Sequence, residues 1–179
     1  AMAGARLLRA RSAYIARLQP AAIEIYRGLS AGKEAFDVRY RPAGEGLDAL
    51  LGQDDKTLAS ALYQLFGGNR DADIAAGFTT AGPHRDDLEV EIAGLPARVY
   101  GSQGQQRSAV LALKLAEATL LRTVTGEQPV ALLDDVMSEL DASRQDYILN
   151  HIHDWQVFVT CCDPEPLRRM EGGVEFHMK

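Results

Sequence analysis

Residues 129–141 read Pro-Val-Ala-Leu-Leu-Asp-Asp-Val-Met-Ser-Glu-Leu-Asp, and the interpretation of the whole chain depends on them. A short apolar run that ends in two carboxylates is typical of a strand buried on both faces, whose C-terminal end delivers Asp134 and Asp135 to a site. Open α/β sheets bind their ligands at that end. Two adjacent anions repel each other, so such a pair usually has a cation nearby or takes part in proton transfer. A strand followed by a solvated acidic turn gives the same pattern, so both interpretations stay open here.

Composition narrows the class of protein. The chain has 179 residues, of which 46% are hydrophobic and 25% charged, as in ordinary globular proteins large enough to bury a core. Its net charge of -6 argues against a surface that is basic throughout, although a local basic patch is compatible with it. We see no membrane span and no signal peptide. Cys161 and Cys162 are adjacent, which disfavours a disulfide and predicts free thiols in a cytoplasmic protein.

The first 72 residues alternate between helical and extended patterns. Helical spacing covers residues 5–28, with Pro20 expected to kink or divide the helix. The four arginines among the first 20 residues fit a solvated helix face or a contact with missing upstream chain better than a DNA-contacting stripe. Alternating residues predict a strand at 33–41, and helical spacing returns at 57–66, where Gly67-Gly68-Asn69 is expected to end the helix.

A hairpin is predicted next. Residues 74–81 and 88–92 have strand patterns, and a short third strand is expected at 97–100. The polar tip between the first two strands includes His84 and Arg85, which a turn with a local ion pair would also explain.

The second half predicts a helix between strands. Residues 101–107 are small or polar and precede a helix at 108–124, an arrangement that suits a phosphate at the positive helix end. A helix start capped by Ser102 explains the same residues equally well. A helix at 143–153 and a strand at 156–160 follow the Asp-Asp strand, which predicts a parallel pair with a right-handed crossover. A short helix after residue 166 and an edge strand at 174–177 complete the prediction.

The order of these motifs is more specific than any one of them. Ser-x-Gly-Gln-Gln opening a helix, then an apolar strand ending Asp-Asp, then Ser-Glu-Leu-Asp, resembles the C-terminal half of an ABC-type ATPase head. With Thr-Thr-Ala-Gly-Pro-His-Arg-Asp-Asp-Leu at residues 79–88, the chain is similar to the RecF family of bacterial DNA replication and repair proteins. The resemblance is strong over 73–163. Over 5–72 it is weaker and looks like the helical arm that the family inserts into its head.

The resemblance implies an α/β fold in two segments. Residues 73–179 would form the C-terminal half of an ABC-type P-loop ATPase head, with parallel strands, crossover helices and an antiparallel hairpin. Residues 1–72 would be the end of the helical arm. No Gly-x-x-x-x-Gly-Lys-Ser/Thr loop occurs in the sequence, and the chain starts inside a predicted helix. We therefore expect the C-terminal part of a longer ATPase, inactive by itself.

The family's nucleotide site carries over residue by residue. Ser102, Gly104 and Gln105 match the signature motif, which completes the ATP site of the opposite subunit. Asp134 matches the Walker B aspartate, which holds Mg²⁺ through its water shell. Asp135 lies where the family keeps the acidic residue that orients or deprotonates the attacking water.

Five further residues match family motifs. Ser138 and Asp141 match the D-loop, which touches its counterpart across the dimer. Thr160 occupies the catalytic switch position, where many ABC proteins have His, so the resemblance does not carry γ-phosphate sensing over to it. His84 and Arg85 match a family motif without an assigned role.

The resemblance also implies cofactors and partners. The cofactors are ATP and Mg²⁺. The partners are a second copy of the protein in a homodimer, DNA at gaps or single-strand/double-strand junctions, and RecO/RecR-type mediators. The protein would act in the cytoplasm, without a membrane, in recombinational repair, replication-fork maintenance and the SOS response. One alternative is a non-catalytic adaptor that kept the dimerising face of such a head. Another is a chromosome-maintenance or exonuclease-type ABC ATPase, whose head halves are separated by hundreds of coiled-coil residues that this short helical stretch does not favour.

Overall fold

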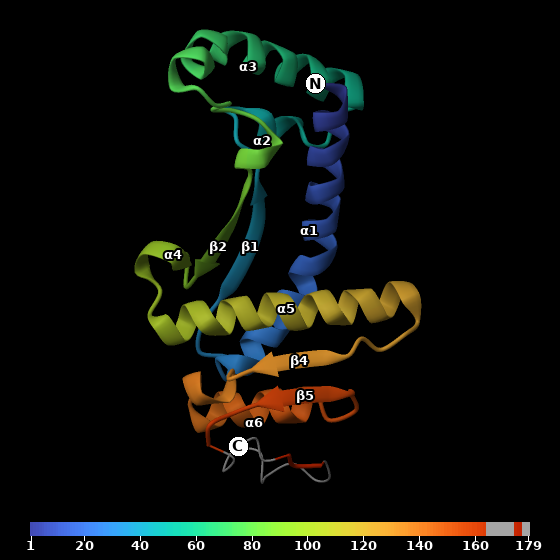
Figure 1. Cartoon of the computed structure of the whole chain (residues 1–179), viewed down its shortest axis with the longest axis vertical. Helices are drawn as coiled ribbons and strands as arrows, with labels where there is room; N and C mark the ends of the chain where they lie inside the picture. Colours follow the sequence, from blue (N-terminus) through green and yellow to red (C-terminus); the bar gives the residue numbers. More distant parts are fainter. Residues whose placement is uncertain (164–173, 177–179) are drawn as a thin grey trace.

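One long helix runs beside both parts of the molecule in the computed structural model, which describes residues 1–163 and 174–176 (Figure 1). Helix α1, Met2–Leu29, is continuous through Pro20, so of the expected kink or division at this proline the division is wrong. An apolar stripe explains the helix, because its buried residues recur at helical spacing along one face. They are Ala5, Leu8, Ile15, Leu18, Ala22, Ile25, Tyr26 and Leu29.

The upper part of the molecule is helical. Helices α2, Leu47–Leu50, and α3, Asp55–Ala76, pack on the N-terminal half of α1 around a small core. Asp54 caps α3, because its side chain accepts from the backbone N–H groups of the first turn. The predicted helix end at residues 67–69 and the predicted strand at 74–81 are wrong. The helix continues through both glycines and ends at Gly77, whose φ of 75° is the left-handed C-cap conformation.

An antiparallel sheet connects the two parts. Its strand order is β1, Phe36–Arg41, then β2, Asp87–Ile92, then β3, Leu95–Pro96. The partner of β2 is therefore β1 rather than the predicted strand at 74–81, and Phe36 pairs with Ile92. The third strand also lies earlier than predicted, because Ala93 and Gly94 both have positive φ and close a two-residue hairpin turn. The predicted strand at 97–100 is instead helix α4, Ala97–Tyr100.

The lower part contains the parallel strands, as predicted. Helix α5, Gln103–Thr125, crosses α1 (Figure 1), and β4, Ala131–Asp134, follows it. The chain then forms the 3₁₀ turn η2, Met137–Glu139, helix α6, Ala142–His151, and β5, Val157–Thr160. Strands β4 and β5 are parallel, which confirms the crossover through α6. The main core joins α1, β1, α5, β4 and α6.

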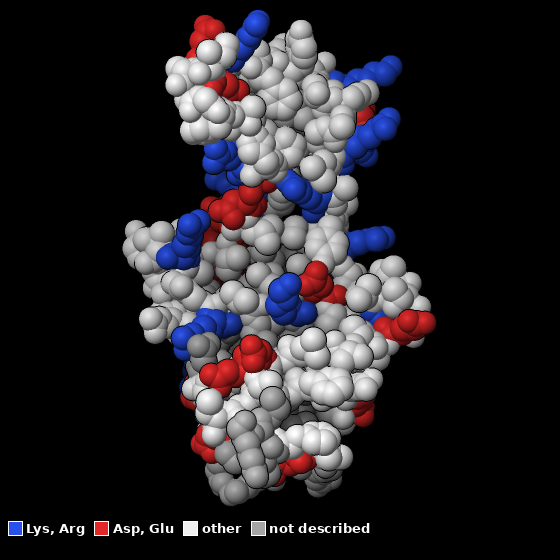
Figure 2. All heavy atoms as spheres, in the orientation of Figure 1, with Lys and Arg blue, Asp and Glu red and all other residues white. Residues whose placement is uncertain are grey.

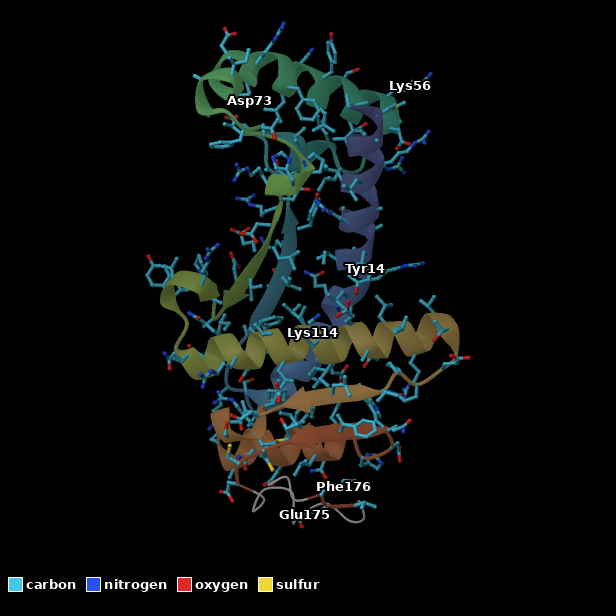
Figure 3. All side chains as sticks on the ribbon, viewed as in Figure 1. Tyr14, Lys56, Asp73, Lys114, Glu175 and Phe176 are labelled. Carbon is cyan, nitrogen blue, oxygen red and sulfur yellow. The ribbon has the colours of Figure 1, made fainter. Side chains whose placement is uncertain are left out.

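Apolar side chains of α1 and α5 pack together in the main core, and one exposed polar contact joins the two helices where they cross. Tyr14 Oη donates to Glu117 Oε1 at 3.4 Å, and Lys114 Nζ pairs with the other oxygen of that carboxylate at 3.0 Å. Figure 3 shows Tyr14 and Lys114 close together at the crossing point. Figure 2 shows Lys and Arg side chains interspersed with Asp and Glu on this face of the molecule, in line with the net charge.

The parallel pair is covered on one face only. Leu133 is 8% exposed, but Leu132 and its neighbour across the ladder, Phe158, are 75% and 58% exposed. The prediction that this strand is buried on both faces is therefore wrong for this chain. Described residues 174–176 form no strand, and His177 and the helix predicted after residue 166 lie outside the described residues.

The predicted boundary between residues 72 and 73 falls inside α3. In addition, β1 and β2, from the two sides of that boundary, form one sheet. The division into an arm segment and a head segment stays a prediction.

Candidate functional site

The two adjacent strand ends place three predicted residues together. Asp134 is paired with Thr160 in the parallel register, and the threonine hydroxyl donates to Asp134 Oδ1. The same hydroxyl oxygen accepts from the Asp135 backbone N–H at 3.1 Å, and the Thr160 carbonyl accepts from that N–H at the same distance. A hydroxyl has one proton to donate, so the proton of Thr160 is committed to the carboxylate of Asp134.

The chain turns sharply immediately after these contacts. Asp135 has a φ of 51°, the left-handed region that few residues other than glycine adopt, although aspartate tolerates it. Ser138 Oγ donates to the Asp135 carbonyl oxygen at 2.9 Å and closes the turn. Gln145 is buried on α6, and its amide donates to the carbonyl oxygens of Met137 and Leu140 at 2.8 and 3.1 Å. These side-chain hydrogen bonds hold the loop between β4 and α6.

Asp141 is the N-cap of α6. Its Oδ1 accepts from the Arg144 backbone N–H at 3.0 Å, and its Oδ2 accepts from Arg144 Nη1 at 2.7 Å. The guanidinium also lies against Gly104, since a Cβ on that glycine would meet Nη1 at 3.4 Å. Arg144 therefore links the loop after β4 to the start of α5.

Ser102 begins α5 with a reciprocal capping box. Its Oγ accepts from the Gln105 backbone N–H at 3.2 Å, and its own N–H donates to Gln105 Oε1 at 2.8 Å. Of the two interpretations that the sequence left open for this segment, the helix start capped by Ser102 is present in the structure. The first N–H groups inside an α-helix have no intrahelical acceptor, so those of Gln103 and Gly104 leave a positive helix end suited to an anion. In Figure 1, α5 begins on the side of the molecule where β4 and β5 end.

His84 and Arg85 lie elsewhere, in the 3₁₀ turn η1, Pro83–Arg85, beside the upper part of α1. The His84 ring Nε2 is 3.1 Å from the Thr79 carbonyl oxygen, and Arg85 Nη2 donates to the same oxygen at 3.4 Å. The Arg85 guanidinium also lies 5.1 Å from the ring centroid of Phe78. Both side chains therefore hold the turn that follows α3, and the structure does not bring them to the carboxylates.

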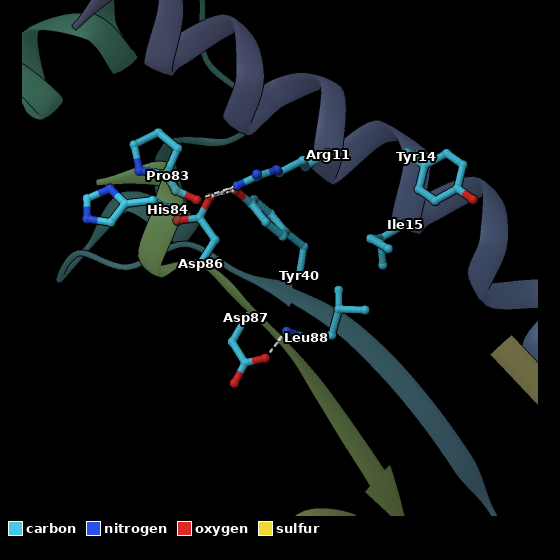
Figure 4. Close-up of a pocket in the computed structure, with 9 residues that line it drawn as sticks. All are labelled: Arg11, Tyr14, Ile15, Tyr40, Pro83, His84, Asp86, Asp87 and Leu88. Carbon is cyan, nitrogen blue, oxygen red and sulfur yellow. Dashed lines mark hydrogen bonds and ion pairs between the residues drawn. The ribbon is translucent and has the colours of Figure 1, made fainter. Parts of the chain in front are cut away.

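The residue that follows this pair makes the longer-range contacts. The Asp86 carboxylate, with its side chain 4% exposed, accepts from Arg11 Nη1 at 2.7 Å, from the Ala43 N–H at 2.9 Å and from Tyr40 Oη. Burial, and then the hydrogen bond to Asp86, raise the pKa of Tyr40, which keeps the phenol protonated as a donor. Arg11, Tyr40 and Asp86 line part of an open groove of about 340 Å³ between α1 and the antiparallel sheet (Figure 4). Sequence reasoning placed Asp86 in the polar tip but gave it no role of its own, because adjacent aspartates give no sign of which one is buried.

The carboxylate pair fits Mg²⁺ only with additional ligands. Among the described residues, no group of three or more His, Cys, Asp or Glu side chains could hold a metal ion. Mg²⁺ prefers six oxygen ligands and usually keeps several waters, so Asp134 would contribute through one of these waters, and other waters and phosphate oxygens would supply the rest of the shell.

The described part of the chain contains no helix that could span a membrane. Both cysteines are free thiols, as predicted.

Comparison with known proteins tests the family resemblance. No protein-family model matches the chain. The "DNA replication and repair protein RecF" of Acetivibrio thermocellus is 36% identical over 174 residues, which cover 97% of this chain and 46% of the relative. The RecF of Synechocystis sp. is 43% identical over 158 residues, which cover 88% of this chain and 40% of that protein. The chain belongs to the RecF family.

Solved structures support the fold. The structure of the recombination mediator protein RecF-ATPrS in the RecFOR pathway matches with a TM-score of 0.78 and 33% identity, over 96% of this chain and 44% of that one. RecF-ATP in the same pathway matches with a TM-score of 0.72 and 36% identity. The α/β fold of the RecF ABC-type ATPase is therefore confirmed. The chain spans less than half the length of the curated RecF relatives it matches.

Proposed function

We propose that this chain contributes one half of a composite ATP site in a RecF-type DNA repair ATPase, in which two subunits close on each other around nucleotide. The observation that carries the proposal is the meeting of Asp134, Asp135 and Thr160 at the C-terminal ends of two parallel strands. The solved RecF structures support the proposal, since they are described as RecF-ATPrS and RecF-ATP.

The three residues divide the chemistry between them. Bound Mg²⁺ would neutralise phosphate charge, with Asp134 as a ligand through water. Asp135 is the candidate base that orients or deprotonates the attacking water. Thr160 acts as a positioning residue, because its proton fixes Asp134 and its oxygen accepts from the Asp135 N–H. It has no second proton with which to sense a phosphate.

The start of α5 would serve the opposite subunit. There Ser102, Gly104 and Gln105 present a hydroxyl and helix-terminal N–H groups to the γ-phosphate. We assign the contact across the homodimer to the loop that carries Ser138 and Asp141. Both oxygens of Asp141 already bind Arg144 within the subunit, so Asp141 would shape that loop as the cap of α6.

The whole protein would bind DNA at gaps or single-strand/double-strand junctions and dimerise with ATP. Hydrolysis would release it, and RecO/RecR-type mediators would act with it in the cytoplasm, including during the SOS response. The chain alone has no phosphate-cradling Gly-x-x-x-x-Gly-Lys-Ser/Thr loop, and we propose that it does not hydrolyse ATP by itself.

The test joins this chain to the Walker A-bearing N-terminal half of a RecF protein and follows dimerisation by light scattering, with and without ATP and DNA. Asp135→Asn should retain ATP-dependent dimerisation and lower turnover by at least about 100-fold, the lower end of the effect of general acid–base catalysis. Asp154→Asn, an exposed aspartate on the loop after α6, is the matched control and should have no effect. ATP turnover by the 179-residue chain alone, abolished by Asp135→Asn, would refute the composite site.

Thr160 has its own pair of variants. Thr160→Val keeps the shape of the side chain and removes the hydroxyl, whereas Thr160→Ser retains the hydroxyl. The joined protein should lose turnover with valine and keep most of it with serine. Equal activity of the two variants would rule out positioning by the hydroxyl.

A further inference from the structure

Glu34 lies in the short connection between α1 and β1, inside the strand predicted at 33–41 but outside every functional motif singled out in the sequence. Its two carboxylate oxygens have different partners. Oε2 accepts from Tyr26 Oη at 2.6 Å, and Oε1 accepts from Gln105 Nε2 at 2.8 Å, across 71 positions of sequence. The carboxylate thus connects the end of the long helix to the first turn of α5.

The second contact constrains how the Gln105 side chain is oriented. Its Oε1 accepts from the Ser102 N–H at 2.8 Å, while its Nε2 donates to Glu34. An ionised carboxylate can only accept, so it selects the amide orientation that turns the NH₂ group toward it and the oxygen toward Ser102. The reverse orientation would place oxygen against oxygen and NH₂ against N–H. Glu34 therefore favours the one arrangement in which the capping box closes.

The first contact fixes Glu34 to the main core. Tyr26 is fully buried, and its ring stacks on Phe36 with centroids 4.5 Å apart and 16° between the planes. Burial, and then the hydrogen bond to Glu34, raise the pKa of this phenol, so the donor is retained at neutral pH. The carboxylate is thereby held by a rigid part of the structure.

We propose that Glu34 is a positioning residue for the signature serine. It orients Gln105, which in turn holds Ser102 at the start of α5, so the geometry of this loop depends on the connection between α1 and β1. The consequence for nucleotide binding rests on the proposed function, whereas the positioning itself can be measured in the chain without nucleotide.

The test is residue-by-residue amide hydrogen exchange of the 179-residue chain by NMR. Glu34→Ala should speed exchange of the Ser102 and Gln105 N–H groups by about tenfold, the factor that corresponds to 1.4 kcal/mol. Exchange in α3 should not change. Glu24→Ala is the matched control, because Glu24 is an exposed glutamate on α1 whose ion pair with Arg27 is also exposed. It should leave the Ser102 N–H unaffected.

Two further variants separate positioning from general destabilisation. Glu34→Gln retains an acceptor for Gln105, so the exchange rates of the Ser102 and Gln105 N–H groups should stay within about threefold of those in the parent chain. Tyr26→Phe keeps the stacked ring and removes only the donor to Glu34, and it should give an intermediate rate even if Glu34→Ala does not fold. Unchanged Ser102 and Gln105 exchange in the folded Glu34→Ala chain would overturn the proposal. If Glu34→Ala does not fold, unchanged exchange in Tyr26→Phe would do so.

ATP-dependent dimerisation of the joined protein is measured in parallel. If the parent protein fails to dimerise with ATP while Glu34→Ala still speeds exchange at Ser102, the proposed function is wrong and the positioning role stands. If the parent dimerises with ATP and Glu34→Ala leaves both dimerisation and exchange unchanged, the positioning role is wrong and the proposed function stands.

Discussion

Removing the Asp86 side chain should destabilise the chain far more than removing that of the next residue. Asp86→Ala removes the acceptor of Tyr40 Oη and of the Ala43 N–H, and it leaves Arg11 with only the Pro83 carbonyl oxygen. Breaking a buried charged pair costs about 3–5 kcal/mol, and the lower end applies because the Arg11 side chain is 41% exposed and can reach water. We therefore expect a loss of about 3 kcal/mol. For a chain of this size this loss lowers Tm by roughly 6–12 °C.

The neighbouring aspartate is a natural control for this prediction. Asp87 pairs with Arg98 at 3.7 Å, and the two side chains are 72% and 91% exposed. An exposed pair of this kind contributes little, so Asp87→Ala should change the free energy of unfolding by less than about 0.5 kcal/mol. Urea denaturation followed by circular dichroism measures both variants, with an unchanged slope showing that the transition is comparable. Equal losses in the two variants would refute the argument from burial.

Three other predictions concern packing, association and pH. Gly28→Ala would bring a Cβ within 2.0 Å of the Tyr147 ring and should cost about 1–2 kcal/mol in urea denaturation, whereas Gly68→Ala, with nothing within 4 Å, should stabilise α3 by about 0.5–1 kcal/mol. Leu132→Ser should reduce self-association of the chain in light scattering without loss of Tm, because this side chain is exposed on an apolar face. Burial, and then a nearby arginine, lower the pKa of His151 below 6.5, so the unfolded chain binds more protons. Stability should therefore be complete above about pH 6.5 and fall as the pH drops below it, and His151→Gln should remove this part of the slope.

The lower part of the fold was predictable because its signals are local. The apolar run at 131–134 predicts a strand, and the helical segment after it predicts that the next strand, at 157–160, lies parallel to the first. This topology brings Asp134 and Thr160 together. The strand pairing of β2 was not predictable in the same way. Its partner β1 is distant in sequence, and a strand pattern does not identify its neighbour.

The wrong helix end at residues 67–69 has a local explanation. Gly67 and Gly68 lie in open space without positive φ, so they cost helix propensity but do not stop the helix. Termination requires a residue in the left-handed conformation, and Gly77 provides it.

The residues that support the site were the harder part to predict. Ser102 and Asp141 are recognisable as helix caps from their positions ahead of α5 and α6. Glu34 and Arg144 carry no comparable signal, because their contacts with the start of α5 depend on the tertiary arrangement. An acidic residue in a connecting loop looks like any solvated charge until its partners are known.

The continuity of α1 has a mechanical consequence. Its 28 residues correspond to about 42 Å of continuous helix, whose first half packs in the small helical core and whose second half packs in the main core. One helical backbone therefore joins the two cores, in addition to the β1–β2 sheet. A movement of the small helical core relative to the main core would strain α1 and the connection that follows it, where Glu34 lies.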